Sequence, residues 1–172
     1  GRVSRGAAGL SRRPRRVQSR PVNTTARPNA FSRDDLLGFE DTPLLVQERR
    51  VRFQDVDAAG TIFFPRVLEY FADAYQELLE RAGIDVPKIL RERSMAAPLA
   101  HAEADYLAPL LFGDPVTVQI AMARVGSSSV TLGHRMLKKG RAAAVGITVH
   151  VFVDGASFQP VAVPDTDRKS VV

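Results

Sequence analysis

The sequence contains no cysteine and no apolar run long enough to span a bilayer. Without cysteine the chain can form neither a disulfide framework nor a thiolate metal site, and a membrane-spanning helix needs about 20 consecutive apolar residues. The three histidines, His101, His134 and His150, lie far apart within strand-like stretches, so their spacing does not indicate a metal site. We therefore predict a soluble, cytoplasmic protein that uses no metal and no cofactor.

Acidic residues are absent from the first 33 positions, which hold nine arginines and three prolines. The other 15 Lys and Arg and all 19 Asp and Glu lie in residues 34–172, which leaves that part at −4 although the whole chain carries +5. A segment with so few apolar residues cannot bury enough surface to offset the entropy of ordering. We predict that residues 1–43 are a disordered tail and linker. A solvated extension, an organelle-targeting segment and a nucleic-acid-binding arm are alternative roles for it.

A length of 172 residues with 45% hydrophobic residues fits one domain with an ordinary core. Turn-forming and polar residues continue to Pro43, and the last apolar strand ends at Asp154-Gly155. We place the domain at residues 44–155, followed by a C-terminal extension at 156–172. No internal repeat is visible.

The most informative stretch is residues 51–66, VRFQDVDAAGTIFFPR. Proline is favoured at the first position of a helix, where its missing N–H would have no partner anyway, so a helix begins near Pro65. Backbone N–H groups at a helix start are unpaired and lie at the positive end of the helix dipole. Two carboxylates, Asp55 and Asp57, thus precede a site suited to a developing negative charge.

After Pro65, apolar residues recur at spacings of three and four, which is the period of an amphipathic helix. The apolar positions are Leu68, Phe71, Tyr75, Leu78 and Ala82. Gly83 follows the last of them, where a left-handed terminating residue is common, so we expect the helix to end there.

From Ala96 onward the apolar period changes to two, which is typical of strands with one buried face. Four such strands follow one another, separated by turn residues at Gly113-Asp114, Gly126-Ser127 and Lys139-Gly140. An earlier strand is predicted at residues 46–53. One long helix beside a run of antiparallel strands indicates an α+β fold in which the helix covers the concave face of a curled sheet.

These residues resemble the hotdog-fold acyl-CoA thioesterases of the 4-hydroxybenzoyl-CoA thioesterase family. The resemblance covers about residues 45–153 and rests on the Asp-x-Asp-x-x-Gly motif before the helix, followed by DYLAPLLFGDPVTV. It implies a hotdog fold, an antiparallel sheet wrapped around one long helix. It also implies homodimers paired edge to edge, often as homotetramers, with active sites at the subunit interface.

Within this resemblance, Asp57 matches the catalytic carboxylate and the backbone N–H of Phe64 matches the donor that polarises the thioester carbonyl. Gly60 is expected to permit close backbone approach, and Asp55 to have a structural or orienting role. The chemistry agrees, because an activated thioester needs only a carboxylate, as nucleophile or general base, and donors aimed at the oxyanion. A turn or helix-capping role is the alternative for Asp57.

Phe63, with Phe64 and Phe71, suggests an apolar wall for an aromatic or medium-length acyl group, although Phe71 fits the core equally well. Relatives from the bacterial Tol-Pal system have a Tyr and a His where this chain has Phe53 and Phe64. Two segments are candidates for binding coenzyme A. They are Ser127, Ser128 and Ser129, and the basic turn with Lys138 and Lys139.

We therefore predict an enzyme, an acyl-CoA thioester hydrolase that acts on hydroxybenzoyl-like, dihydroxynaphthoyl-like or medium-chain acyl-CoA. The alternative is a non-catalytic hotdog binding protein whose Arg-rich tail contacts nucleic acid or an anionic surface. A dehydratase is disfavoured because such enzymes place a His near the helix start, and no His occurs before His101. Acyl-CoA and further copies of the chain are the expected partners, and nucleic acid is not.

Overall fold

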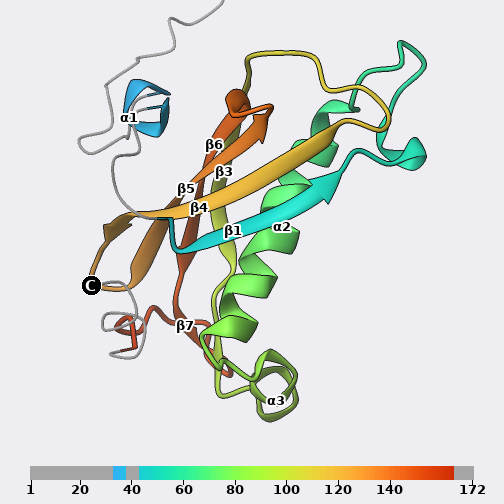
Figure 1. Cartoon of the computed structure of the whole chain (residues 1–172). Coiled ribbons are helices and arrows are strands. Elements are labelled where there is room, and N and C mark those ends of the chain that lie inside the picture. Colours follow the sequence, from blue (N-terminus) through green and yellow to red (C-terminus); the bar gives the residue numbers. More distant parts are fainter. Residues whose placement is uncertain (1–32, 38–42, 165–172) are drawn as a thin grey trace, which may run out of the picture. The chain divides into compact units, whose positions relative to one another are not determined.

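One long helix lies across one face of a five-stranded antiparallel sheet (Figure 1). The computed structural model describes residues 33–37 and 43–164. The strands run in the spatial order β1 (Leu45–Arg50), β4 (Pro115–Val125), β5 (Ser129–Lys138), β6 (Arg141–Val151) and β3 (Leu99–Tyr106), and the helix is α2 (Phe64–Arg81). This is the predicted α+β arrangement, and all four strands after Ala96 form where the alternation placed them.

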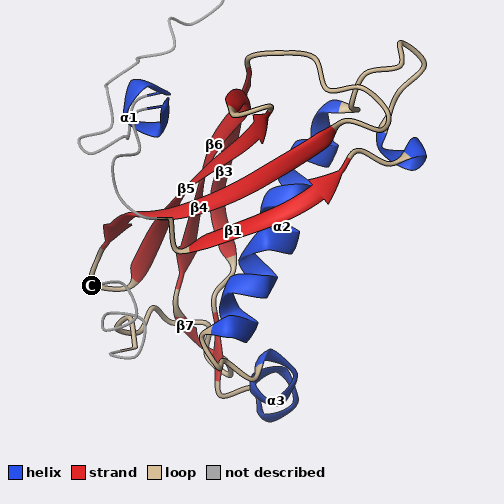
Figure 2. Cartoon of the chain, viewed as in Figure 1, coloured by secondary structure: helices blue, strands red, loops and turns tan. Residues whose placement is uncertain are grey.

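Shorter elements connect these layers (Figure 2). They are α1 (Arg33–Leu37), the 3-10 turn η1 (Phe53–Asp55), α3 (Val86–Glu92), and a two-stranded sheet of β2 (Met95–Ala96) and β7 (Val153–Asp154). The first predicted strand is shorter than expected, because the chain leaves β1 after Arg50 and turns through η1. In the described part of the chain, no helix combines the length and the apolarity that crossing a bilayer requires.

Both ends of α2 agree with the sequence signals. Pro65 lies in its first turn, and Phe63 is the preceding cap residue in extended conformation. At the other end, Ala82 caps the helix and Gly83 has a φ of +76°. A left-handed residue is favourable there because glycine has no Cβ to clash.

The main core lies between α2 and the facing side of β4 and β5. The buried residues of α2 are Val67, Tyr70, Phe71 and Ala74. They face the alternating apolar positions of the two strands, which are Val116, Val118, Ile120, Leu132 and Met136. Each fully buried side chain of this size contributes about 1.5–3 kcal/mol relative to exposure, so this layer dominates the stability of the fold.

Strand β6 meets α2 with its small residues and turns its valines to the other face of the sheet. Ala144 joins the core beneath α2, whereas Val145 and Ile147 pack on the other side of the sheet with Leu36 of α1. At Gly146 an added Cβ would lie 2.7 Å from the Phe71 ring, so the glycine gives that ring its space. The small α2-facing positions of β6 thus accommodate large side chains from the helix, and the valines cover the opposite face.

Two segments outside the predicted domain contribute buried residues. Leu36, in the predicted linker, is 3% exposed, and Val163, in the predicted C-terminal extension, is 3% exposed and packs with Val130 and Phe152. Val161, also in the predicted C-terminal extension, is partly buried against the same cluster as Val163. The expected disorder of the tail falls on residues 1–32 and 38–42, which lie outside the described residues.

Candidate active site

Residues 55–63 form a small hairpin that leads from the sheet into α2. Its rungs are the bond from the Phe63 N–H to the Asp55 carbonyl (2.7 Å), the bridge between Val56 and Ile62, and the bond from the Asp57 N–H to the Thr61 carbonyl (2.9 Å). A second contact, from the Ile62 N–H to the Leu110 carbonyl (2.7 Å), ties the hairpin to the segment after β3. The whole DxDxxG motif therefore belongs to one hydrogen-bonded unit.

Asp57 lies at the tip of this hairpin and is exposed. Its Oδ1 accepts a hydrogen bond from the Ala59 N–H (2.8 Å), and its carbonyl accepts one from the Gly60 N–H (3.0 Å). Gly60 has a φ of +78°, and nothing lies within 4 Å of the position that a Cβ would occupy. The turn conformation therefore favours glycine at position 60, although a Cβ there would meet no neighbouring atom.

The Phe64 amide is the first N–H of α2, and among the described residues it donates to no acceptor. The N–H of Phe63, one residue earlier, donates to the Asp55 carbonyl, and Pro65, one residue later, has no N–H. A single unpaired donor therefore lies at the positive end of an 18-residue helix, the kind of group that stabilises an oxyanion. This geometry agrees with the role predicted for Phe64.

Asp55 is fully buried, unlike Asp57. Its Oδ2 accepts hydrogen bonds from the Tyr70 hydroxyl (2.6 Å) and from the Arg52 N–H (2.8 Å), and the Arg52 guanidinium lies within 3.2 Å. Burial by itself would raise the pKa of Asp55, but the bonds from Tyr70 and Arg52 outweigh it and hold the pKa below its ordinary value. Asp55 is therefore an ionised, fully engaged anchor.

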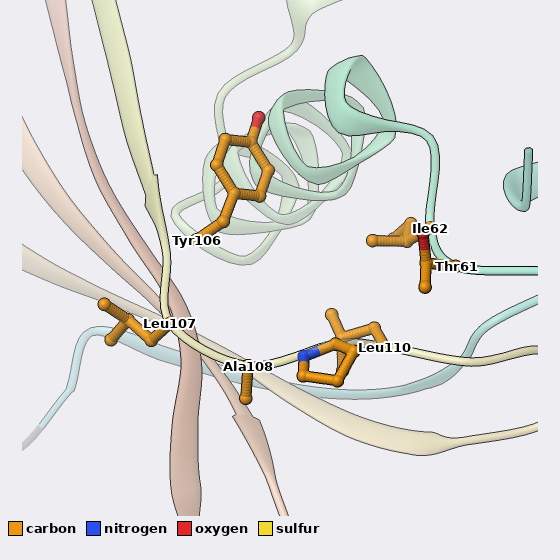
Figure 3. A pocket seen from close by; sticks show the side chains of 7 residues that line it. Thr61, Ile62, Tyr106, Leu107, Ala108 and Leu110 are labelled. Carbon is orange, nitrogen blue, oxygen red and sulfur yellow. The ribbon is translucent and has the colours of Figure 1, made fainter. Parts of the chain in front are cut away.

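A pocket of about 310 Å³ opens beside the hairpin. Figure 3 shows Thr61 and Ile62 on one side and the segment from Tyr106 to Leu110 on the other. The lining is mainly aliphatic, and the Tyr106 hydroxyl donates to the Phe64 carbonyl (2.7 Å) at the start of α2. The volume is at the lower end of the range for small-molecule sites and suits a ring-sized group rather than a whole nucleotide.

The aromatic residues divide between wall and core. Phe63 and Phe64 are 45% and 62% exposed and contact each other edge to face, but neither lines the pocket, so the predicted wall stays a prediction. Phe71 is buried in the core, where it stacks on His134. An exposed edge-to-face pair, Phe53 with Phe112, was not found from the sequence, because the two residues are 59 positions apart and share no motif.

The structure separates the two segments predicted to bind coenzyme A. Lys138 ends β5, at the sheet end that holds the hairpin, and forms an ion pair with Asp114 (2.5 Å), whereas Lys139 is exposed in the turn. Ser127, Ser128 and Ser129 lie at the opposite end, where Val125 pairs with Val130. Within one chain, the serines and Asp57 therefore do not form one site.

Two of the three histidines are buried between the sheet and α2. His134 stacks on Phe71 (4.7 Å between ring centroids), and His150 stacks on Tyr75 (4.2 Å). Burial lowers the pKa of His134 to about 3, so it is a neutral core residue, as the sequence predicted for a sheet position. Among the residues described here, no three His, Asp or Glu side chains gather in a way that could hold a metal ion.

Comparison with known proteins supports what this geometry indicates. Residues 51–169 match the family model of the thioesterase-like superfamily, a range that begins at the DxDxxG hairpin and includes the whole sheet after it. The chain belongs to this superfamily. The predicted hotdog fold and the predicted class, a thioester hydrolase, are thereby confirmed, whereas membership of the 4-hydroxybenzoyl-CoA thioesterase family in particular stays a prediction.

Three relatives illustrate the similarity. A 1,4-dihydroxy-2-naphthoyl-CoA hydrolase from Nostoc punctiforme is 33% identical over 117 residues, which are 68% of this chain and 79% of that protein. Another from Synechococcus is 35% identical over 128 residues, with 72% and 86% covered. The solved structure of a gentisyl-coenzyme A thioesterase has a TM-score of 0.67 and 28% identity, with 74% and 100% covered.

Proposed function

We propose that the protein hydrolyses aromatic acyl-CoA thioesters to the free acid and coenzyme A, with Asp57 as nucleophile or general base. The observation that carries the proposal is the hairpin of residues 55–63. It presents an exposed carboxylate at its tip and an unpaired Phe64 N–H at its end, beside a ring-sized pocket. These are the two groups that thioester hydrolysis requires.

The reaction has two forms that the same residues support. As general base, Asp57 takes a proton from water while the water oxygen attacks the thioester carbonyl. The tetrahedral oxyanion then accepts a hydrogen bond from the Phe64 N–H. Its collapse breaks the C–S bond and releases the CoA thiolate, which takes the proton from Asp57. As nucleophile, Asp57 forms a mixed anhydride with release of CoA, and water then hydrolyses that anhydride. Both forms give the same products.

Two features favour an aromatic acyl group over a medium-chain one. The pocket measures about 310 Å³, and Tyr106 in its lining is bonded to the start of α2, where the rings of Phe63 and Phe64 are exposed. The relatives named above act on 1,4-dihydroxy-2-naphthoyl-CoA and gentisyl-CoA, whose acyl groups are hydroxylated rings. Thr61 and Tyr106 place two hydroxyl groups in the lining, where they suit a polar ring substituent.

Assembly into a homodimer would complete the site. The outer edge of β3 has no strand partner among the described residues, and such an edge readily pairs with another chain. Two-fold antiparallel pairing of β3 strands would bring the serine turn of one subunit towards the hairpin end of the other. Residues 127–129, with Lys138 and Lys139, would then bind the pantetheine and phosphates. Tetramer formation and the cytoplasmic location stay predictions.

Free-thiol release from a panel of substrates tests the proposal. The panel contains benzoyl-, gentisyl- and 1,4-dihydroxy-2-naphthoyl-CoA together with C6–C12 acyl-CoAs. We expect the highest kcat/KM for the hydroxylated aromatic thioesters. Preference for a medium chain would overturn the substrate class, and no hydrolysis of any member would overturn the proposed function. Single-turnover hydrolysis in ¹⁸O-water gives positive evidence for the nucleophilic mechanism if label enters Asp57, which requires an anhydride that water attacks at the Asp57 carbonyl.

Sedimentation and subunit mixing test the assembly. We expect a dimer or tetramer at assay concentration. Mixing an Asp57→Asn chain with a chain altered at Ser127, Ser128 and Ser129 should restore hydrolysis, because one of the two sites in a mixed dimer has both sets intact. An active monomer would contradict the shared site.

A further inference from the structure

Asp55 connects three parts of the chain that meet at the candidate site. Its side chain is bonded to Arg52, before the hairpin, and to Tyr70, in the second turn of α2. Its carbonyl accepts the Phe63 N–H at the base of the hairpin. A single fully buried residue thus joins the hairpin, the preceding turn and the helix.

Tyr70 extends this connection to the sheet. Its hydroxyl lies 2.6 Å from Asp55 Oδ2 and 3.1 Å from the Arg50 carbonyl at the end of β1. The Tyr70 side chain is 1% exposed, and the Arg49 guanidinium lies 4.9 Å from the centre of its ring. The hydroxyl is therefore held in place by packing on all sides.

The two reacting groups lie at the ends of the segment that this contact holds. Asp57 follows Asp55 by two residues at the hairpin tip, and Phe64 follows the Phe63 N–H that is bonded to Asp55. The distance from carboxylate to amide donor therefore depends on how the hairpin sits against α2. In the described part of the chain, the Asp57 side chain accepts one hydrogen bond, from the Ala59 N–H of the same turn, so its direction depends on the backbone of that turn.

We propose that Asp55 and Tyr70 are positioning residues, which lock the hairpin against α2 so that the Asp57 carboxylate and the Phe64 N–H face the same thioester carbonyl. The inference rests on the proposed function and adds how its geometry is maintained. Neither residue touches the substrate. The carboxylate of Asp55 suits this task because it accepts hydrogen bonds from the Tyr70 hydroxyl and from the backbone and guanidinium N–H groups of Arg52, and the Arg66 guanidinium lies 4.0 Å away. An amide in its place would direct an N–H donor toward one of these donor groups.

Tyr70→Phe is the sharpest test because it removes one hydroxyl and keeps the buried ring. We expect kcat to fall about 10- to 100-fold with KM for the acyl-CoA within about two-fold, because misplacement of reacting groups affects the transition state more than binding. Asp55→Asn should show the same division between kcat and KM, with a larger loss. Circular dichroism at the assay temperature confirms that each variant is folded.

Val118→Ala is the matched control, since Val118 is buried in β4, where it pairs with Gln47 and Met136, and it does not line the pocket. We expect its melting temperature to fall at least as far as that of Tyr70→Phe, with kcat within two-fold of wild type. If Tyr70→Phe keeps wild-type kcat, or if Val118→Ala loses as much, the positioning role is overturned while the proposed function stands. If the wild type hydrolyses no thioester, both fall.

Discussion

The two ends of α2 are built on opposite principles. At the first end, the Phe64 N–H has no acceptor among the described residues, Asp57 is exposed, and a pocket of about 310 Å³ opens beside them. At the last end, Ala82, Gly83 and Ile84 each donate a backbone bond to the final turn of the helix. The nearby cavity measures only about 60 Å³ and has a largely apolar lining.

This difference shows what makes one end of a helix reactive. Both ends begin with unpaired backbone groups. In the last turn, the carbonyls of Leu78, Leu79 and Glu80 accept backbone bonds. The cavity beside that end is lined by apolar side chains that include Met122 of β4, Val130 and Leu132 of β5, and Phe152. The first end leaves a donor open and places a charged side chain near it. The polar network that we propose holds that arrangement joins buried Asp55 and Tyr70 to exposed Arg52.

The largest effect should come from Asp57→Asn, which removes the charge and the nucleophile at the reactive end. We expect turnover to fall by about 10²–10⁴ with little change in melting temperature, because the amide oxygen can still accept from Ala59. Asp154→Asn is the control, since Asp154 Oδ1 accepts in the same manner from the Ala156 and Ser157 N–H groups in a turn elsewhere. Unaltered hydrolysis by Asp57→Asn would remove this residue from the mechanism.

A pH titration of stability probes the middle of α2, away from both ends. The pKa of His134 is about 3 in the folded protein against an ordinary 6.5, so below pH 6.5 the unfolded chain takes up a proton that the folded one does not. Stability should therefore be full above pH 6.5 and fall by roughly 4 kcal/mol towards pH 3. In the His134→Gln variant, the midpoint of urea unfolding should depend less on pH over this range. If that variant loses stability as steeply on acidification, the pH dependence belongs to other titratable groups.

A pair of glycines allows the two ends to be compared directly. Gly60 and Gly83 both have positive φ, +78° and +76°, and nothing lies within 4 Å of either Cβ position. Alanine at each should cost about 1 kcal/mol of stability through backbone strain. Only Gly60→Ala should also lower kcat, because its turn carries Asp57. Equal kcat in both variants would show that the turn conformation does not matter to the reaction.

The smallest effect should come from shortening the N-terminus, which is at neither end of α2. A chain that begins at Arg33 should hydrolyse within about two-fold of the full chain. A chain that begins at Leu44 also lacks Leu36, which covers Val145 and Ile147, and should melt several degrees lower. Thiol release and thermal unfolding check both. A large loss of turnover in the chain that begins at Arg33 would show that the tail contributes to the site.

Local signals predicted much of the fold correctly. Pro65 and Gly83 indicated the ends of α2, because their effect on the backbone does not depend on the rest of the chain. The period of two indicated β3 to β6 for the same reason. It could not tell which face of β6 meets the helix, since Val145 and Ile147 are buried whichever side they take.

The candidate site was predictable in part. The order of Asp57, Gly60 and Phe64 is local, so the unpaired amide at the helix start was predicted from the motif and Pro65, whereas the hairpin was not. The partner of Lys138 was not predictable, because Asp114 precedes it by 24 positions and lies in the turn before β4. The burial of Asp55 was also not predictable, because Asp55 and Asp57 are the same residue type in the same motif and differ only in which distant side chains pack over them.

The amino-acid sequence by itself determined the α+β class, the start and end of the long helix, and the DxDxxG turn that precedes it, because each depends on backbone preferences over a few residues. Tertiary structure decided which carboxylate is buried, which face of β6 the helix covers, and which basic side chain is already paired. These depend on contacts between segments far apart in the chain, and burial and charge pairing become definite only when those segments meet.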